Sequence, residues 1–295
     1  MNGVIIINKP AEWTSHDVVA KTRGLLKERQ IGHLGTLDPL ATGVLPLAVG
    51  AATRLIEFTS YPKEYVTTCL LGKTTDSCDV TGNILGEKPA NGLSEETVRA
   101  EVLKLGDIME QVPPMVSALK KDGKKLYELA RQGVEVERKA RPIRMEAVEI
   151  LNINIPRVTF RVACSAGTYV RVLCQTLGEQ LGVGGCMETL ERTWVGSFSL
   201  AESLTLAEVK KGVEAGNLSG MLLPASRLVS HLPQVQLKGK VLENLCQGRA
   251  MDTAGGTPLG LYRVINEQGR LSAVAEASPE GLLKPKKVFG MEGIQ

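Results

Sequence analysis

The sequence predicts an α+β protein with a mixed, mainly antiparallel sheet and a small β-rich domain at the C-terminus. Segments with strand alternation and segments with helical periodicity follow one another irregularly, whereas a doubly wound fold repeats regular βαβ units. The composition is that of an ordinary globular protein, with 43% hydrophobic and 23% charged residues among 295. The pattern changes near HLPQVQ (231–236), a linker-like join. We therefore expect domains at 1–231 and 232–295.

The first elements follow from the spacing of apolar residues. GVIIIN (3–8) is a continuous apolar run, typical of a buried strand. A helix is expected from His16 to about Arg29, with Ser15 as its N-cap. After a Gly/Pro-rich stretch comes VLPLAVG (44–50). KEYVTTCLLG (63–72) predicts a strand, and TTDSCDVTGN (74–83) predicts a loop.

The middle of the chain alternates between helices and strands. Helices are expected at 93–106, beginning after Ser94 and ending at Gly106, and at 124–133, ending at Gly133. VTFRVACS (158–165) alternates strictly and predicts a strand. A helix at 168–182 has Thr168 as its expected cap, and Thr205 begins a capping box before a short helix.

The C-terminal segment predicts a separate β-rich fold. GKVLENLCQG (239–248) has the pattern of a short helix. GLYRVINEQGRLSAVAEA (260–277) predicts a hairpin whose turn is supplied by Asn266 to Gly269.

Composition excludes several classes of protein. The six cysteines form no C-x-x-C pair and only three histidines exist, so a structural zinc site is not expected and the thiols are expected to be free. The N-terminal apolar run, Val4 to Ile7, is too short for a signal peptide, and no run reaches membrane-spanning length. We therefore expect a cytoplasmic protein without a membrane partner.

Familiar nucleotide and hydrolase motifs are incomplete. Gly72-Lys73-Thr74 ends like a phosphate-binding loop, but Thr67 occupies the position of the first glycine. Met187 replaces the third glycine of a dinucleotide fingerprint, and no G-x-S-x-G is present.

Basic residues are concentrated in two places. Residues 120–144 contain nine Lys/Arg and four Asp/Glu, a local net charge of +5 in a chain whose total is +3. A second cluster is Lys284, Lys286 and Lys287. Each could be a solvated face, but two such clusters favour a partner with a phosphate backbone.

The stretch with the most conformationally special residues is GHLGTLDPLATGVLP (32–46), which holds three glycines and two prolines around a single aspartate. Gly32, Gly35 and Gly43 allow backbone conformations closed to other residues, and Pro39 keeps Asp38 out of the helical region. An isolated Asp-Pro pair is usually only a turn. Here, however, the carboxylate lies among apolar residues and needs a partner, for which Arg171 is the candidate.

This stretch closely resembles the catalytic motif of the TruB family, the bacterial tRNA pseudouridine-55 synthases. Four further segments resemble family motifs in the same order: Asn8-Lys9-Pro10, Lys63-Glu64-Tyr65 with TTDSCDVTG, PPMVSALKKDGKKLYELARQG (113–133) and CSAGTYVRVLCQTLG (164–178). The likeness covers residues 3–230, and the C-terminal segment resembles the RNA-binding PUA domain more weakly. Val116 departs from the pattern, because the family commonly has an aromatic residue there.

The resemblance implies isomerisation of the T-loop uridine of tRNA to pseudouridine, without cofactor or metal. It implies that Asp38 is the essential carboxylate, that Arg171 is its ion-pair partner and that Tyr65 stacks on the uracil. It further implies that Tyr169 lines the pocket, that His33 fills the space left by a flipped nucleotide, and that Lys9 and Pro10 support the loop. We expect Lys120, Lys124 and Lys125 to join Lys9 in the RNA-binding region, and the protein to act as a monomer on the T-arm.

Three alternatives stay open at this point. Asp38 can attack the sugar, add to the base or remove a sugar proton. The chain can be a non-catalytic tRNA-binding protein that assists folding, although a pure binder has no need of an acidic residue near phosphate. A nucleoside hydrolase is disfavoured because a metal-binding Asp cluster is lacking.

Overall fold

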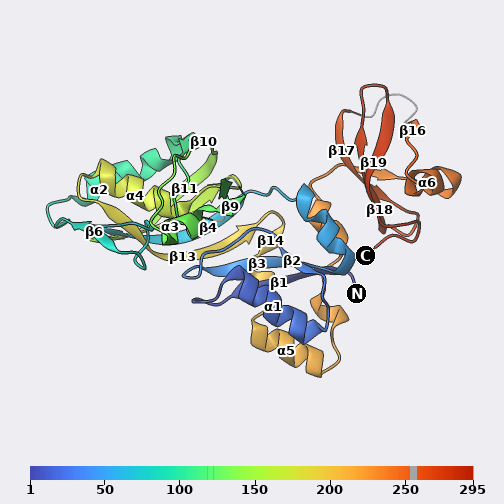
Figure 1. Ribbon diagram of the computed structural model, residues 1–295, viewed down its shortest axis with the longest axis horizontal. Coiled ribbons are helices and arrows are strands. Elements are labelled where there is room, and N and C mark those ends of the chain that lie inside the picture. Colours follow the sequence, from blue (N-terminus) through green and yellow to red (C-terminus); the bar gives the residue numbers. More distant parts are fainter. Residues whose placement is uncertain (118, 122, 253–257, 295) are drawn as a thin grey trace. The chain divides into compact units, whose positions relative to one another are not determined.

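The computed structural model describes residues 1–295 except 118, 122, 253–257 and 295 (Figure 1). The chain forms two compact units that interleave along the sequence. Unit 1 contains Met1–Pro39, Gly43–Ser60 and Ser197–Gln295, and unit 2 contains Leu40–Thr42 and Tyr61–Gly196.

Unit 1 is built on a short antiparallel sheet. Strand β3 (Thr42–Val49) pairs with both β1 (Gly3–Lys9) and β2 (Ile31–His33). The apolar run that predicted β1 is buried throughout, as expected of a strand covered on both faces. The backbone of β1 also exchanges hydrogen bonds with Leu204 and Leu223.

Two helices of unit 1 contact each other, α1 (Ser15–Leu26) and α5 (Leu206–Glu214) (Figure 1). The expected cap of α1 was wrong by one residue. Thr14 is the N-cap and forms a capping box with Asp17, which leaves the Ser15 hydroxyl for another contact. The predicted capping box of α5, Thr205 with Glu208, is confirmed. Short 3₁₀ turns complete this part: η1 (Gly50–Phe58), η3 (Leu200–Glu202), η4 (Ser219–Met221) and η5 (Ala225–Val229).

The C-terminal part of unit 1 is a five-stranded sheet with one helix. Its strands are β15 (Gln234–Gln236), β16 (Met251–Asp252), β17 (Gly260–Ile265), β18 (Leu271–Ala277) and β19 (Leu282–Val288), in the order β15-β17-β18-β19-β16. Helix α6 (Gly239–Cys246) contributes Leu242 and Leu245 to a core of its own with these strands. The predicted hairpin turn at 266–269 is confirmed, with Gly269 N–H donating to the Asn266 carbonyl. The predicted boundary at 231/232 stays a prediction, because this sheet belongs to unit 1.

Unit 2 is built on four antiparallel strands in the order β13-β4-β12-β11. These are β4 (Lys63–Leu71), β11 (Met145–Asn154), β12 (Arg157–Cys164) and β13 (Gly185–Val195). The predictions for β4 and β12 are confirmed, whereas β11 and β13 were not predicted. Smaller strands are β5 (Lys73–Thr75), β6 (Ile84–Glu87), β7 (Glu110–Gln111), β8 (Lys120–Lys121), β9 (Lys124–Lys125) and β10 (Arg141–Pro142); a further strand, β14 (Phe198–Ser199), lies in unit 1.

Helices α2 and α4 contact each other and pack on this sheet (Figure 1). Helix α2 (Glu95–Lys104) is capped by Ser94 as predicted and continues into η2 (Leu105–Asp107). Helix α4 (Val170–Gln180) begins after Tyr169 and not after Thr168, whose hydroxyl donates to the Ser165 carbonyl instead. Helix α3 (Leu126–Arg131) is shorter than predicted because Lys124–Lys125 pair with Lys120–Lys121 as strands.

Candidate active site

The loop that carries Asp38 is fixed on both sides of the aspartate. The Ser15 hydroxyl accepts from the Leu37 N–H at 2.9 Å and donates to the Leu37 carbonyl at 3.2 Å. On the other side, the Pro39 carbonyl accepts from the Glu12 N–H at 2.8 Å. Asp38 itself is half-buried, between two residues whose backbone is held by the start of the chain.

The Lys9 side chain holds the same loop through hydrogen bonds to backbone carbonyls. Its side chain is fully buried, and its Nζ donates to the carbonyls of Pro10 at 2.8 Å, Trp13 at 2.6 Å and Pro39 at 3.1 Å. A buried ammonium needs such acceptors, because leaving it without them is costly. This geometry favours support of the Asp38 loop over direct contact with RNA.

Two of the three loop glycines have a backbone that favours glycine. The φ angle is 100° at Gly35 and 99° at Gly43. Gly32 has a different reason, since a Cβ there would lie 2.8 Å from the Ile56 Cδ1 atom. The glycines thus shape the turn that presents Asp38.

His33 lies on β2 opposite Leu47 and meets a second histidine. The ring of His16, at the start of α1, stands edge-on to it, with centroids 5.4 Å apart and planes at 80°. Sequence reasoning missed His16, because no motif marks it and its exposed position on the helix gives no pattern.

In unit 2, Tyr65 lies in the middle of the sheet. It is on β4, is 6% exposed, and is paired in register with Val162 of β12 and Arg192 of β13. Lys63 lies on the same face of β4, two residues before it. Burial, with a smaller effect from the Arg192 guanidinium, lowers the pKa of Lys63 to about 8.

Arg171 is held by groups from two segments of unit 2. It sits in the first turn of α4 and is 2% exposed. Its Nη1 donates to the Ser77 carbonyl at 2.8 Å, and its Nη2 donates to the Val116 carbonyl at 2.9 Å. Its Nε lies 3.8 Å from the Asp79 carboxylate. Val116, where the family pattern has an aromatic side chain, thus contributes through its backbone.

Asp79 is a further site residue that sequence reasoning missed. It is buried, and its Oδ1 accepts from the Ser77 hydroxyl at 2.8 Å, the Thr81 N–H at 3.0 Å and the Thr81 hydroxyl at 2.5 Å. The available signal was Asp79 in the motif TTDSCDVTG, with Ser77 two positions before it and Thr81 two positions after it. The spacing of that motif did not indicate which arginine it would meet.

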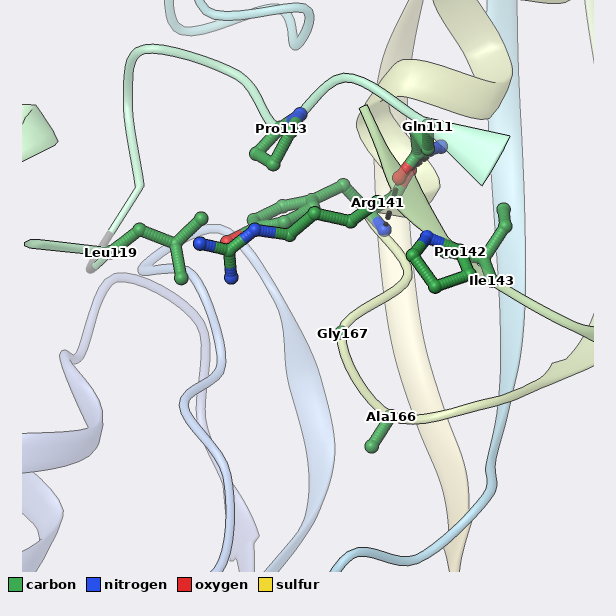
Figure 2. A pocket seen from close by; sticks show the side chains of 9 residues that line it. Gln111, Pro113, Leu119, Arg141, Pro142, Ile143, Ala166 and Gly167 are labelled. Carbon is green, nitrogen blue, oxygen red and sulfur yellow. Dashed lines mark hydrogen bonds between the residues drawn. The ribbon is translucent and has the colours of Figure 1, made fainter. Parts of the chain in front are cut away.

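Tyr169 borders a small pocket in unit 2. Its N–H donates to Gln111 Oε1 at 2.8 Å, and its carbonyl accepts from Gln111 Nε2 at 3.1 Å. Figure 2 shows the Arg141 side chain extended across this pocket toward Leu119. The pocket has a volume of about 150 Å³.

The basic segment forms a short hairpin whose side chains are described only in part. Lys120 pairs in register with Lys125, and Lys121 with Lys124. Lys124 is exposed. The side chains of Lys120 and Lys125 lie outside the described part of the structure.

Unit 1 therefore carries Lys9, His33 and Asp38, and unit 2 carries Tyr65, Tyr169, Arg171 and Lys124. The expected ion pair between Asp38 and Arg171 joins residues of different units and stays a prediction. Among the residues that the structure describes, no group of three His, Cys, Asp or Glu side chains is arranged to hold a metal ion. No described helix is long and apolar enough to span a membrane.

Three family models match the chain one after another. They are TruB family pseudouridylate synthase (N terminal domain) over 23–170, tRNA pseudouridylate synthase B C-terminal domain over 171–230, and pseudouridine synthase II TruB, C-terminal, over 233–289. The chain belongs to the TruB family. The resemblance expected from the motifs is confirmed.

Relatives of this TruB-family chain match along nearly its whole length. The tRNA pseudouridine synthase B of Bacillus licheniformis is 42% identical and covers 100% of this chain and 99% of that protein. That of Heliobacterium modesticaldum is 43% identical and covers 98% of this chain and 96% of that protein.

Solved structures agree with the fold of the TruB-family chain. A chain in the crystal structure of a Cbf5-Nop10-Gar1 complex has a TM-score of 0.76 and 28% identity, covering 97% of this chain and 84% of that chain. A second match, from an H/ACA RNP bound to a substrate RNA containing 2′-deoxyuridine, has a TM-score of 0.75 and 27% identity, with coverage of 97% and 84%. The TruB-family chain is a pseudouridine synthase, and hence an isomerase, with the predicted α+β fold.

Proposed function

We propose that this pseudouridine synthase acts in the cytoplasm on tRNA and isomerises the T-loop uridine at position 55, with Asp38 as the essential carboxylate. The names of its relatives support tRNA as the substrate. The observation that carries the role of Asp38 is the fixed loop, in which Leu37 and Pro39 are both held by hydrogen bonds.

The reaction is an exchange of bonds within one nucleotide. The N1–C1′ bond breaks, the uracil turns while it is bound, and C5 bonds to C1′. The proton at C5 is lost, and N1 gains one, so that no atom enters or leaves overall. Attack at C1′, addition to the base and removal of a sugar proton all require an ionised Asp38 close to the sugar.

Fixed geometry is useful for each of these routes. A carboxylate held in one position reacts without first being ordered, and orientation of this kind accounts for a large part of enzymatic rate enhancement. An acidic side chain repels the phosphates of RNA. A loop that holds the Asp38 carboxylate in place therefore serves catalysis better than it serves RNA binding.

The other residues supply binding and positioning. Tyr65 stacks on the target uracil, an interaction worth about 1–3 kcal/mol, and Arg171 compensates the charge of Asp38. The uridine is flipped out of the T-loop at a cost of a few kcal/mol. His33 fills the vacated space, while Lys124, with Lys120 and Lys125, contacts the backbone of the T-arm.

Asp38→Asn tests the proposal, because asparagine keeps the size of the side chain but cannot act as a base or nucleophile. We expect pseudouridine formation to fall by about 10⁴-fold, on the order of 5 kcal/mol of barrier, with tRNA binding retained since phosphate contacts dominate affinity. The measurement is single-turnover formation on unmodified tRNA, with binding followed in parallel.

The matched control is Asp107→Asn, which removes the same charge from an exposed aspartate of unit 2. It should leave turnover within about twofold of the original protein, since surface substitutions of this kind have small effects. A folded Asp38→Asn protein that still forms pseudouridine at the original rate would refute the assignment.

A further inference from the structure

The segment that faces Arg171 turns at a residue with an unusual backbone. Cys78 has a φ angle of 64°, in the left-handed region that residues with a Cβ atom rarely adopt. The Ser77 carbonyl, just before it, accepts from Arg171 Nη1 at 2.8 Å, and the Asp79 carboxylate, just after it, lies 3.8 Å from Nε. The turn at Cys78 therefore sets the direction of both groups.

The backbone of this turn is fixed to strand β13. The Met187 N–H donates to the Cys78 carbonyl at 3.0 Å, and the Val80 N–H donates to the Met187 carbonyl at 2.9 Å. The Cys78 N–H donates to the Thr75 carbonyl at 3.3 Å. These three bonds hold the segment to the sheet and to itself, whereas Arg171 lies on helix α4. The placement of the segment against α4 is thus left to side chains.

The Cys78 side chain makes a contact with α4. Its Sγ donates to Gln175 Oε1 at 2.8 Å, and the residue is 8% exposed. Burial raises the pKa of the Cys78 thiol to about 11, although the nearby Arg171 guanidinium acts in the opposite direction. The thiol therefore keeps its proton at neutral pH and can act as a donor.

Gln175 is placed and oriented for this contact. It follows Arg171 by four residues on α4, so both side chains lie on the same face of the helix. Its Nε2 donates to Glu179 Oε1 at 2.8 Å, one further turn along. Because the amide nitrogen is used in this way, the amide oxygen is directed to Cys78.

We propose that Gln175 is a positioning residue of the reaction, which holds the turn at Cys78 and thereby orients the Ser77 carbonyl and the Asp79 carboxylate toward Arg171. The proposal rests on the function proposed above, in which Arg171 compensates the charge of Asp38. A guanidinium in a wrong direction keeps its charge but not its alignment. Loss of Gln175 should therefore slow the chemical step and leave tRNA affinity unchanged.

The experiment uses the full-length protein and unmodified tRNA. Single-turnover pseudouridine formation at saturating protein and the Kd for tRNA are measured for Gln175→Met, for Cys78→Ala and for the double variant. Cys78→Ser, which keeps a donor, tests rescue. Gln180→Met is the matched control, because Gln180 is exposed on the same helix. Gln175→Met is also combined with Arg171→Lys, which keeps the charge and removes the planar fork.

We expect Gln175→Met and Cys78→Ala each to slow the single turnover by about tenfold, as small displacements of reacting groups do. The double variant should be no slower than about tenfold either, since contacting residues are not additive. Kd should stay within about twofold throughout, and Cys78→Ser and Gln180→Met should keep the rate within about threefold. In the Arg171→Lys protein, Gln175→Met should cost less than about twofold more, because the residue acts through the arginine.

Two losses that multiply in the double variant would overturn the proposal, since Gln175 and Cys78 would then act separately. Unchanged rates in both single variants, or a rise in Kd that matches the loss of rate, would overturn it as well. Urea unfolding is measured first, and if Gln175→Met does not fold, Cys78→Ala with rescue by Cys78→Ser decides.

The same set separates this inference from the proposed function. If the original protein formed no pseudouridine, or if Arg171→Lys kept the original rate, the role proposed for Arg171 would fail first. A slow Arg171→Lys protein beside fully active Gln175→Met and Cys78→Ala proteins would refute the positioning role alone.

Discussion

At the scale of single residues, the pair of Arg171 and Asp79 stands out because both side chains are buried. The Asp79 Oδ2 lies 3.8 Å from the Arg171 Nε, while its Oδ1 is used by Ser77 and Thr81. The two carboxylate oxygens thus have separate tasks. One orders the loop that carries Asp79, and the other places a negative charge beside Arg171.

Asp79→Asn should separate these tasks. Asparagine keeps an oxygen for Ser77 and Thr81 but removes the charge, so Arg171 keeps its two carbonyl acceptors and loses the negative charge of Asp79 beside it. We expect pseudouridine formation to fall by about 10²-fold and the free energy of unfolding to fall by about 1–3 kcal/mol, the range for one lost buried polar interaction. Single-turnover assays and urea unfolding measure the two effects.

Asp76→Asn is the matched control, because Asp76 lies in the same loop and its carboxylate accepts from Asn83. It should change turnover by less than about threefold, since Asn83 keeps one acceptor. A smaller effect of Asp79→Asn than of Asp76→Asn would contradict the positioning role.

Lys63 provides a test of pH dependence. Its pKa in the folded protein, about 8, lies below the ordinary value of 10.5. Between these values the unfolded chain binds more protons than the folded one, so this residue makes stability rise with pH across the window. Below about pH 8 the lysine is charged in both states, and its burial is unfavourable throughout.

Lys63→Met should therefore be more stable than the original protein at pH 7. The difference in free energy of unfolding should shrink as the pH rises from about 8 to about 10.5. Urea unfolding of both proteins at each pH gives the difference in their free energies of unfolding. The titration of the cysteines contributes equally to both proteins and drops out of this difference. A difference that does not vary with pH would show that Lys63 titrates normally in the fold.

The residues of the site could be found from the sequence where a motif marks them. Asp38 lies among glycines and prolines in an otherwise apolar stretch, and Lys9 precedes a proline, so both belong to recognisable patterns. Asp79 and Gln111 could not be found in this way. Their contacts are with Arg171 and Tyr169, which lie 92 and 58 positions away in the chain, and nothing local encodes such distances.

At the scale of elements, helix α1 and the Asp38 loop are joined by one hydroxyl. Ser15, in the first turn of α1, is 1% exposed and bonds to both the N–H and the carbonyl of Leu37. Because Thr14 caps the helix, the serine is not needed for that purpose. The start of the helix thus has two polar groups with different tasks.

Ser15→Ala should affect the loop, and Thr14→Ala should affect the helix. Without the hydroxyl, the buried Leu37 N–H loses its partner, which costs about 1–3 kcal/mol, and turnover should fall about tenfold because Asp38 is less well fixed. In Thr14→Ala, loss of the helix cap should lower the free energy of unfolding by about 0.5–2 kcal/mol. Its turnover should stay within about twofold of the original protein. Thermal unfolding and single-turnover assays measure both; equal turnover in the two variants would contradict this division.

Sequence patterns predicted elements well where the pattern was unbroken. β4 and β12 alternate regularly, and both were found. β13 contains irregularities between Met187 and Thr189 and between Arg192 and Trp194, and β11 has two of its own. Each bulge shifts the side chains that follow to the opposite face, so the period of two is lost and these long strands were missed.

At the scale of the whole molecule, the two units do not follow the order of the chain. Unit 1 combines the N-terminal sheet with Ser197–Gln295, and most of unit 2 lies between these segments in the sequence. Within unit 1, the C-terminal sheet contacts η1: Arg54 donates to the Val288 carbonyl at 2.9 Å, and Lys287 lies 2.8 Å from Glu57. Composition alone could suggest a boundary near 232 but could not show these contacts.

The C-terminal lysines test whether this part of unit 1 binds RNA. Lys284, Lys286 and Lys287 lie 3.7, 2.7 and 2.8 Å from Glu280, Glu276 and Glu57, respectively. Exposed pairs of this kind contribute little to stability and exchange readily, so the lysines are available to phosphates. If the three lysines were only part of a solvated surface, they would form the same pairs with glutamates, and their replacement would not change tRNA binding.

Replacement of all three lysines by glutamine should therefore weaken tRNA binding without changing the rate at saturating RNA. Each phosphate contact contributes about 0.7–0.9 to the slope of log affinity against log salt, so the slope should become shallower by about 2 if all three make contact.

The control replaces Lys210, Lys211 and Lys240, which are exposed on α5 and α6, and removes the same total charge. Binding is titrated from 50 to 300 mM salt, on the order of the range in which such slopes are resolved. If both triple variants shift affinity and slope equally, the C-terminal lysines act only through net charge; if the first variant loses turnover at saturating tRNA, they belong to the chemistry and not to binding.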